Sequence, residues 1–419
     1  IKEDFKLLEE HLEYLISLPD SDKQKLKKID KGYFIDVTMV ITILDMLEPK
    51  SRGASYYPLV SLNYMKQNPD IDGYIIAKPI VFASLIQASL IDDDLKNYQL
   101  ARSELNLLIS ESRGNQNKLR ALLNPSGQLI SQYYMKGFYS EMDKWIKFIY
   151  DTFDIKKLSK HFALQPNSLI VRYFKAYLEK RHGNLDKAIL INENLFNENG
   201  IKSLLNSNNK FQVNFSQSFV LQKSMPDLYE LYYLTGKKEK FDELNRLLFV
   251  KNIKDLTKED FELVELVGID SFNIYKTMAK YYLQNNMKKQ FAKLIKHSET
   301  KLINFLKKLE KGDTHEAAIN VWNKNDIFRN IAEIGKIFID GGKPKEGKKI
   351  LDSLYPHVIN YYNEQIYQSI WRPNIQDRYI GSIYLEAANN LKKNSVFQQK
   401  AYSIAQITKN TNTSRDIMK

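Results

Sequence analysis

The chain has no cysteine among its 419 residues. This absence excludes disulfide bonds, thiolate metal ligands and a cysteine nucleophile together. It also hints at an oxidising compartment, where unpaired thiols are a liability, although cytosolic bacterial proteins with few cysteines are common. Residue 1 is isoleucine, so we expect that a preceding segment has been removed.

Glycine and proline are scarce, with 16 and 11 residues respectively. So few turn-forming residues argue against a many-stranded β protein and favour long helices. The hydrophobic content of 43% excludes global disorder. The most apolar window, Phe34–Leu47, carries Asp36 and Asp45 and is shorter than the roughly 20 apolar residues that a membrane span requires. We therefore predict no transmembrane span.

Recognisable catalytic signatures are also missing. The six histidines are far apart, and none has a partner at the spacing of a metal site. There is no nucleophile-elbow, dinucleotide-binding or kinase motif. The acidic turn Asp92–Asp94 lacks the glycine and the terminal glutamate of a calcium-binding EF-hand. The sequence does not exclude a pair of carboxylates able to hydrolyse glycosides, because such a pair is defined by its distance in the folded protein and not by its spacing in sequence. We expect a protein that is not an enzyme and that has no catalytic, metal or cofactor site.

The stretch Gly341–Lys349, "GGKPKEGKK", has the glycine-to-lysine spacing of a phosphate-binding P-loop. A P-loop follows a β-strand and continues with Ser or Thr, which holds magnesium. Here the preceding residues have helical spacing, and Lys349 occupies the Ser/Thr position. Pro344 suits the first turn of a following helix. The stretch is therefore predicted to be a turn between two helices.

The spacing around this turn suggests a structural repeat. From Gly335 as origin, an aromatic Phe338 follows three residues on, Gly342 seven on, Gly347 twelve on and Leu351 sixteen on. Small residues let two helices cross closely, and the aromatic side chain fills the space between them. The glycine seven on ends the first helix in a left-handed conformation.

The same frame recurs elsewhere, with substitutions such as Glu179 at an aromatic position. Its members are Ala176, Gly183 and Ala188; Tyr229, Tyr232, Gly236 and Phe241; Ala279, Tyr282, Asn286 and Phe291; and, faintly, Ile130, Tyr133, Gly137 and Met142. This pattern resembles the tetratricopeptide repeat (TPR), a helix-turn-helix unit of about 34 residues. The resemblance implies an all-α, superhelical stack of antiparallel helical hairpins, an α-solenoid, that holds a segment of a partner protein.

The chain also departs from the TPR pattern. Its repeat origins lie 46 to 56 residues apart, and the proline near the end of each TPR unit is missing. We therefore expect longer helices, inserted loops or a third helix, and a non-repeating helical bundle remains the alternative. The predicted domains are an N-terminal helical cap with an irregular loop region (1–79), a TPR-like domain (80–405) and a polar C-terminal tail (406–419).

Charge and aromatic residues supply the remaining candidates. The net charge is +12, and residues 280–349 alone hold 16 basic and 8 acidic residues. Lys289, Lys293 and Lys296 fall on one helical face. With Lys288, they are candidates for binding RNA or another polyanion, in the basic segment Lys288–Lys349. Trp371, with its neighbours Tyr367 and Arg372, and Trp322 are candidate interface residues, because such side chains dominate protein interfaces.

The residues together favour a non-catalytic scaffold or adaptor for protein–protein interaction. The expected partner presents an extended or helical segment to a concave groove, and the chain forms a part of a larger assembly, envelope-associated or, alternatively, cytoplasmic. Two alternatives stay open. The first is polyanion binding through the basic segment. The second is binding of a glycan or small ligand in a helical groove lined by aromatic side chains.

Overall fold

The fold is all-α over every residue that can be described. A computed structural model describes residues 7, 10–11, 13–15, 17–29, 55–67, 74–123, 125–155, 165–206, 214–248, 271–311, 324–366, 377–392 and 394–417. Within these ranges every regular element is a helix, which confirms the predicted fold class. The chain divides into two compact units, residues 1–136 with 140–171, and residues 137–139 with 172–419.

The first unit is built around helix α5. Its helices are α2 (Asp20–Ile29), α4 (Tyr56–Gln67), α5 (Tyr74–Asp92), α6 (Leu95–Glu111), α7 (Gln116–Leu123), α8 (Ser126–Met135) and α9 (Tyr139–Thr152). Helix α5 packs against α4, α6, α7 and α8, and its residues 81–86 are all buried. In the acidic turn after α5, Asp94 caps α6 by accepting a hydrogen bond from the Asn97 backbone at 3.0 Å. The turn is thus a helix cap.

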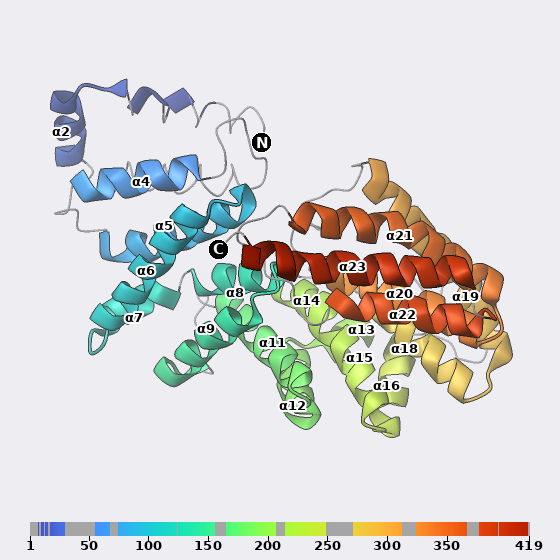
Figure 1. Cartoon of the computed structure of the whole chain (residues 1–419). Helices are drawn as coiled ribbons and strands as arrows, with labels where there is room; N and C mark the ends of the chain where they lie inside the picture. The colour runs from blue at the N-terminus through green and yellow to red at the C-terminus, as the bar shows by residue number, and fades with distance from the viewer. Residues whose placement is uncertain are drawn as a thin grey trace. The chain divides into compact units, whose positions relative to one another are not determined.

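The second unit holds the remaining helices (Figure 1). They are α11 (Gln165–Arg181), which begins in the first unit, α12 (Leu185–Glu198), α13 (Ile201–Asn206), α14 (Phe215–Phe219), the π-helical turn η1 (Val220–Ser224), α15 (Met225–Leu234), α16 (Lys238–Leu248), α18 (Ser271–Gln284), α19 (Lys288–Lys311), α20 (Lys324–Asp340), α21 (Pro344–Ile366), α22 (Asp377–Asn390) and α23 (Ser395–Ile417). Segments α14, η1 and α15 follow one another without a break.

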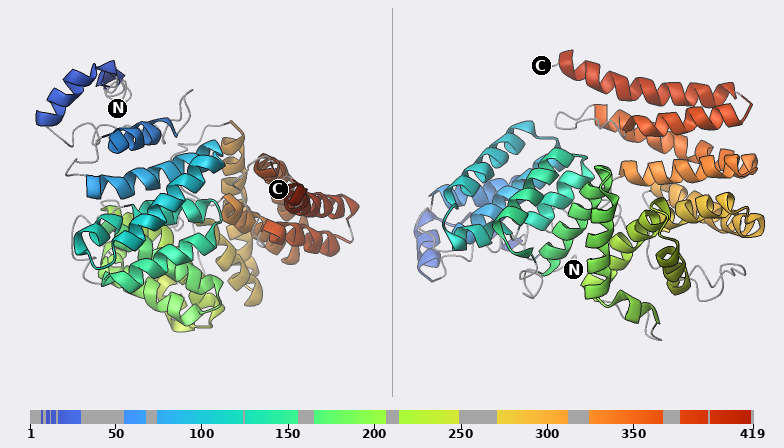
Figure 2. Two further views of the ribbon diagram at one scale, coloured as in Figure 1. Left: turned by 60° about the vertical axis from the view of Figure 1, so that its left-hand side comes forward. Right: turned by 90° about the horizontal axis from the view of Figure 1, so that it is seen from below.

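The helices of the second unit form a stack of antiparallel hairpins. The pairs are α11 with α12, α15 with α16, α18 with α19, α20 with α21, and α22 with α23. Consecutive first helices pack side by side from α15 through α18 and α20 to α22, and the second helices α19, α21 and α23 do the same. Figure 2 shows the last two hairpins, orange to red, running alongside one another. Each hairpin therefore buries its apolar face against its neighbours.

Four of these hairpins share one turn geometry. Gly183, Gly236, Asn286 and Gly342 have left-handed φ values of 79°, 66°, 53° and 77°. In each turn the next backbone N–H donates to the carbonyl five residues earlier, at 2.8 to 2.9 Å. This hydrogen bond ends the first helix as in a Schellman motif. The stretch with P-loop spacing is one of these turns, between α20 and α21.

The small residues of the repeat frame lie where the two helices of a hairpin cross. A Cβ on Gly347 would lie 2.4 Å from the Gly335 carbonyl oxygen, and a Cβ on Gly335 would lie 2.9 Å from the Leu351 Cγ. Ala176, Ala188 and Ala279 are fully buried, as is Phe338. These positions therefore set the close approach of the paired helices.

Aromatic side chains join successive hairpins. The ring of Phe241 on α16 lies 5.0 Å from that of Tyr281 on α18. The ring of Phe291 on α19 lies 5.9 Å from that of Phe338 on α20, edge to face. A Cβ on Gly341 would lie 2.3 Å from the Phe291 ring, so the missing side chain at Gly341 makes room for this contact.

The structure divides the chain differently from the sequence-based domains. The predicted boundary after residue 79 falls inside α5, whose apolar run joins α4 and α6 in one core. The compact units divide near residues 136–172 instead. Helix α23 continues to Ile417, through most of the segment predicted as a polar tail. None of the described helices is long and apolar enough to cross a membrane.

Candidate functional site

A cluster of charged side chains lies on the first helices of the second unit. The Lys180 ammonium group on α11 contacts Asp227 at 2.7 Å and Glu230 at 2.5 Å, both on α15. Glu230 in turn contacts Lys276 on α18 at 2.6 Å. Carboxylate groups therefore lie between the ammonium groups of neighbouring helices, and each helix is joined to the next by at least one ion pair.

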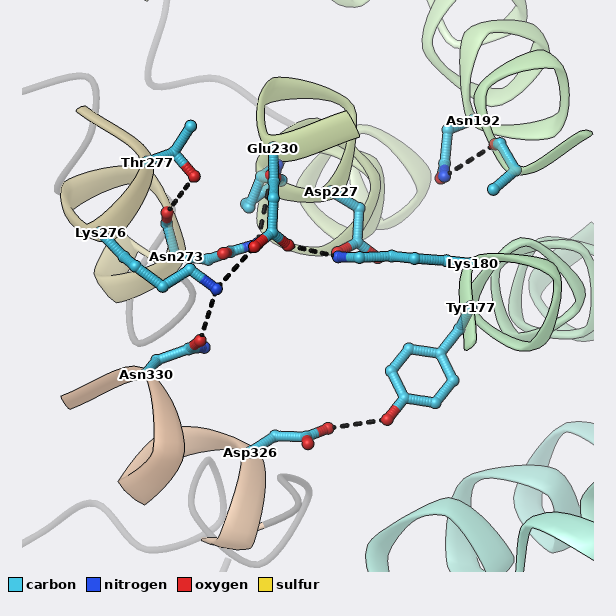
Figure 3. A network of polar contacts seen from close by, with 12 residues as sticks. Tyr177, Lys180, Asn192, Asp227, Glu230, Asn273, Lys276, Thr277, Asp326 and Asn330 are labelled. Atoms are coloured by element: carbon cyan, nitrogen blue, oxygen red, sulfur yellow. Dashed lines mark hydrogen bonds and ion pairs between the residues drawn. The ribbon is translucent and has the colours of Figure 1, made fainter. Parts of the chain in front are cut away.

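The chain of contacts continues onto α20. The Lys276 ammonium group donates to the Asn330 side chain at 2.9 Å. Lys280, one turn further along α18, contacts Glu333 at 2.9 Å. Figure 3 shows the side chains of this cluster pointing toward one another from four different helices. The cluster thus spans α11, α15, α18 and α20.

A hydrogen bond between α11 and α20 closes this cluster into a ring. The Tyr177 hydroxyl donates to an Asp326 carboxylate oxygen at 2.9 Å, across 149 residues of sequence (Figure 3). Arg329 contacts the other Asp326 oxygen at 3.2 Å. We name the seven residues that complete the ring the polar circuit: Tyr177, Lys180, Asp227, Glu230, Lys276, Asp326 and Asn330. Helices α11 and α20 are therefore in direct contact through the side chains of Tyr177 and Asp326.

Ion pairing holds Glu230, Glu333 and Lys180 in their charged forms against the effect of burial. Burial alone raises the pKa of Glu230, but Lys180 and Lys276 outweigh it and bring that pKa well below its usual value. The pKa of Glu333 is lowered in the same way by Lys276 and Lys280. Burial alone lowers the pKa of Lys180, yet Asp227 and Glu230 raise it overall. These groups therefore do not titrate near neutral pH.

Next to the polar circuit, an arginine stacks on a tyrosine. The Arg181 guanidinium carbon lies 3.7 Å from the centre of the Tyr139 ring, and the Tyr139 and Tyr177 hydroxyls are 3.4 Å apart. Burial first, and Asp326 second, raise the pKa of Tyr177 above its usual value. The Tyr177 hydroxyl therefore stays protonated and acts as a hydrogen-bond donor.

The chemistry open to the polar circuit is limited by this pairing. A general acid or base works best with a pKa near the operating pH, whereas the shifted groups here are moved away from neutrality. Two buried acceptor atoms, the Asp227 Oδ2 and the Asn273 Oδ1, have no hydrogen-bond partner among the described residues. Such atoms are suited to accept from bound water. The circuit is thus fitted to hold four helices together.

The sequence-predicted site residues lie elsewhere. Lys288, Lys289, Lys293 and Lys296 are all exposed on α19, while Phe291, Leu294 and Ile295 on the opposite side are buried. Trp322, Tyr367, Trp371 and Arg372 lie outside the described residues. Within the ranges that the structure describes, no three His, Asp or Glu side chains are grouped to hold a metal ion.

Sequence reasoning missed the polar circuit. Its signal is faint but present in the first helices, where charged residues interrupt apolar runs. Lys276 stands in "FNIYKTMA", and Asp227 and Glu230 stand in "MPDLYELYYL". The sign of these charges alternates from one first helix to the next. The sequence does not show which helices lie side by side, so it could not show that these charges pair with one another.

Comparison with known proteins does not add a family. No family model matches the chain, and no curated protein matches it. A solved structure described as a "circular tandem repeat protein with novel repeat topology and enhanced subunit contact surfaces" aligns at 11% identity over 99% of this chain and 91% of that one. The TM-score of 0.23 is too low to support any inference about fold or function.

Proposed function

We propose that this chain is a non-catalytic, TPR-like scaffold that binds protein partners as part of a larger assembly. The observation that carries the proposal is the repeated hairpin turn at Gly183, Gly236, Asn286 and Gly342, with one hydrogen-bond pattern in each. Stacked hairpins of this kind present long surfaces to other proteins. The paired, charged state of the polar circuit supports a structural role for the buried acids and bases that link these helices.

The polar circuit limits where a partner binds, because it lies on the face formed by the first helices of the hairpins. Between α11 and α20 this face is taken up by the polar circuit, whose side chains contact one another. A partner that bound there would have to break buried ion pairs, which is costly. We therefore place partner binding on other surfaces of the hairpins.

Affinity capture with the full chain tests this proposal. The immobilised protein is incubated with native lysate and washed in parallel at low and high salt, and bound protein and nucleic acid are both identified. A stoichiometric protein partner that survives high salt supports the scaffold. Capture of no protein at stoichiometric level, in lysate from several growth conditions, would overturn it.

Polyanion binding is a second candidate, favoured by one observation. Lys288, Lys289, Lys293 and Lys296 are exposed along a single helix, α19. Binding of a fluorescent single-stranded RNA is measured against salt for the wild type and for the double variant Lys289→Gln, Lys293→Gln. If these lysines neutralise phosphates, the logarithmic salt slope falls by roughly 0.7 for each lysine–phosphate pair that the substitutions remove. An unchanged slope rules out this candidate.

A further inference from the structure

A groove of about 500 Å³ lies between α19, α20 and α21, well away from the hairpin turns. Its floor is apolar, because Leu306 on α19 and Ile327 and Phe328 on α20 are buried there. Leu309 on α19 and Tyr361 on α21 line its walls and are partly exposed. A groove of this size and lining can take several apolar side chains. We name it the α19–α21 groove.

Two lysines accompany this apolar floor in the lining of the groove. Lys307 and Lys324 line the groove, and neither makes an ion pair with any described residue. Glu310 is the one acidic side chain among the described lining residues. Burial lowers the pKa of His357, which also lines the groove, although Glu310 acts in the opposite direction. His357 is therefore neutral at pH 7, and the described residues that line the groove carry a net positive charge.

The groove adjoins a second, shallower hollow on α21. Ser353 lines both of them, and Lys345, Lys348 and Lys349 line the second. Lys348 and Lys349 are paired with Asp352 and Glu299, but Lys345 makes no ion pair with a described residue. The two hollows together form an elongated surface with an apolar floor at one end and lysines along it. An elongated occupant fits this shape better than a compact molecule.

We propose that the α19–α21 groove binds an acidic, amphipathic peptide segment of a partner protein. Apolar side chains of the segment pack on Leu306 and Phe328, and its carboxylates pair with Lys307 and Lys324. Charge complementarity and the apolar floor select this occupant over nucleic acid, which favours arginine for phosphate recognition; the described lining residues include no arginine. The proposal rests on the scaffold function and gives that function a site and a class of partner.

A proline within α21 interrupts the backbone hydrogen bonds of that helix beside this surface. Pro356 lies inside the helix and lines the groove. Because proline has no N–H, the carbonyl of residue 352 lacks the donor that residue 356 would ordinarily supply. Asp352 itself lines the adjoining hollow.

A peptide-display selection on the full chain tests the proposal. A random library of 16-residue peptides is selected on the immobilised wild type and counter-selected on the Lys307→Glu variant, and the survivors are sequenced. We expect survivors with net negative charge and Leu, Ile or Phe at regular spacing. Failure to enrich such peptides, or enrichment of neutral or basic ones, would overturn the proposal.

Matched variants then locate the binding on the protein. Lys307→Glu and Lys308→Glu change the net charge equally on adjacent, exposed positions of α19, but Lys308 does not line the groove. We expect Lys307→Glu to weaken a selected peptide about tenfold or more, and Lys308→Glu about twofold at most. Leu309→Gln, at a partly exposed wall position, should also weaken it. Equal effects of the two lysine variants would show general electrostatic attraction and refute the groove.

The remaining outcomes are also decisive. Self-association that Lys307→Glu abolishes and Lys308→Glu leaves intact would assign the groove to a second copy of the chain. RNA binding with the same sensitivity would assign it to nucleic acid, and either result overturns the peptide proposal. If a captured protein partner binds Lys307→Glu as well as it binds the wild type, the groove proposal fails while the scaffold function stands. If no protein is captured, the scaffold function itself fails.

Discussion

At the scale of single residues, the crossing of α20 and α21 leaves no space for a side chain at Gly347. A Cβ there would meet the Gly335 carbonyl oxygen at 2.4 Å and the Ile339 Cγ1 at 2.7 Å. Backbone atoms of a packed helix cannot move aside alone, so the two helices would have to separate. Gly342 differs, because a Cβ there would have nothing within 4 Å. The cost of adding a side chain at Gly342 comes instead from its left-handed φ of 77°.

We predict that Gly347→Ala lowers the free energy of unfolding of the second unit by about 2 to 3 kcal/mol, as in an overpacked core. Gly342→Ala should cost about 1 to 2 kcal/mol, because alanine is strained in the left-handed conformation. Urea unfolding followed by circular dichroism measures both. A Gly347→Ala protein as stable as the wild type would show that the crossing is wider than described.

The buried lysine of the polar circuit gives a second residue-scale prediction. The Lys276 side chain is 5% exposed and contacts Glu230 at 2.6 Å. Its replacement by methionine leaves Glu230 with one cationic partner, Lys180, in place of two. We expect Lys276→Met to cost about 2 to 4 kcal/mol of unfolding free energy.

An exposed pair supplies the control for this prediction. Lys237 contacts Asp186 at 2.8 Å, and the Asp186 side chain is 85% exposed. Lys237→Met should therefore change stability by less than about 0.5 kcal/mol. Similar decreases for the two variants, in thermal or urea unfolding, would contradict a special role for the buried cluster.

At the scale of elements, the Tyr177–Asp326 hydrogen bond couples α11 to α20. Removal of the hydroxyl in Tyr177→Phe should cost about 1 to 2 kcal/mol, because a buried carboxylate oxygen loses its donor. A double-mutant cycle with Asp326→Asn should then show a coupling free energy of at least about 0.5 kcal/mol. Urea unfolding of the four proteins measures it.

Tyr282 on α18 provides a matched control. It is also a buried tyrosine on a first helix, but its hydroxyl has no hydrogen-bond partner among the described residues. Tyr282→Phe removes an unsatisfied polar atom and should leave stability unchanged or raise it. A decrease at Tyr282 equal to that at Tyr177 would indicate a general effect of the hydroxyl and not a link between α11 and α20.

The hairpins themselves could be predicted from the sequence, because each depends on local geometry. A single turn and helix crossing requires a residue in the left-handed conformation, two small residues and one aromatic residue. The last hairpin, α22 with α23, does not follow the glycine spacing of the others, and its connection explains why. Residues 391–394 join α22 to α23, one residue more than the three that join α20 to α21, and the left-handed position is taken by Lys392 at φ 59°. A search based on glycine spacing misses both changes.

The polar circuit could not be predicted in the same way. Tyr177 and Asp326 are far apart in sequence, and no local rule brings α11 against α20. Glu179 shows the same difficulty at short range. It stands at an aromatic position of the frame, where its carboxylate accepts from Asn184 at 2.8 Å and pairs with Lys175 at 3.0 Å. Glu179 therefore departs from the aromatic pattern of the repeat but still stabilises the turn, through its contacts with Asn184 and Lys175.

At the scale of the whole molecule, the ion pairs make stability depend on pH. The pKa values of Glu230 and Glu333 are lower in the folded chain than their ordinary value of 4.5. The unfolded chain therefore takes up these protons first as the pH falls. Their contribution to stability is complete above pH 4.5 and is lost as the pH falls through the folded pKa values.

We predict that the midpoint temperature of the second unit stays nearly level from pH 7 to about 5 and falls steeply below about 4.5. Calorimetry across this range measures it. Glu230→Gln removes one of the responsible groups and should flatten the acid limb while lowering the midpoint at pH 7. An acid limb that keeps its full slope in Glu230→Gln would show that other carboxylates dominate acid unfolding.

The closed ring of contacts among the first helices also affects the order in which the protein folds during synthesis. In an open stack of hairpins each unit can settle as soon as its predecessor is in place. In this chain, the Tyr177 hydroxyl can form its hydrogen bond to Asp326 only after the 149 residues up to Asp326 have also been synthesised. As the chain leaves the ribosome from its N-terminus, α11, α15 and α18 can associate in order. Their buried charges then gain the last of their partners only when α20 has emerged.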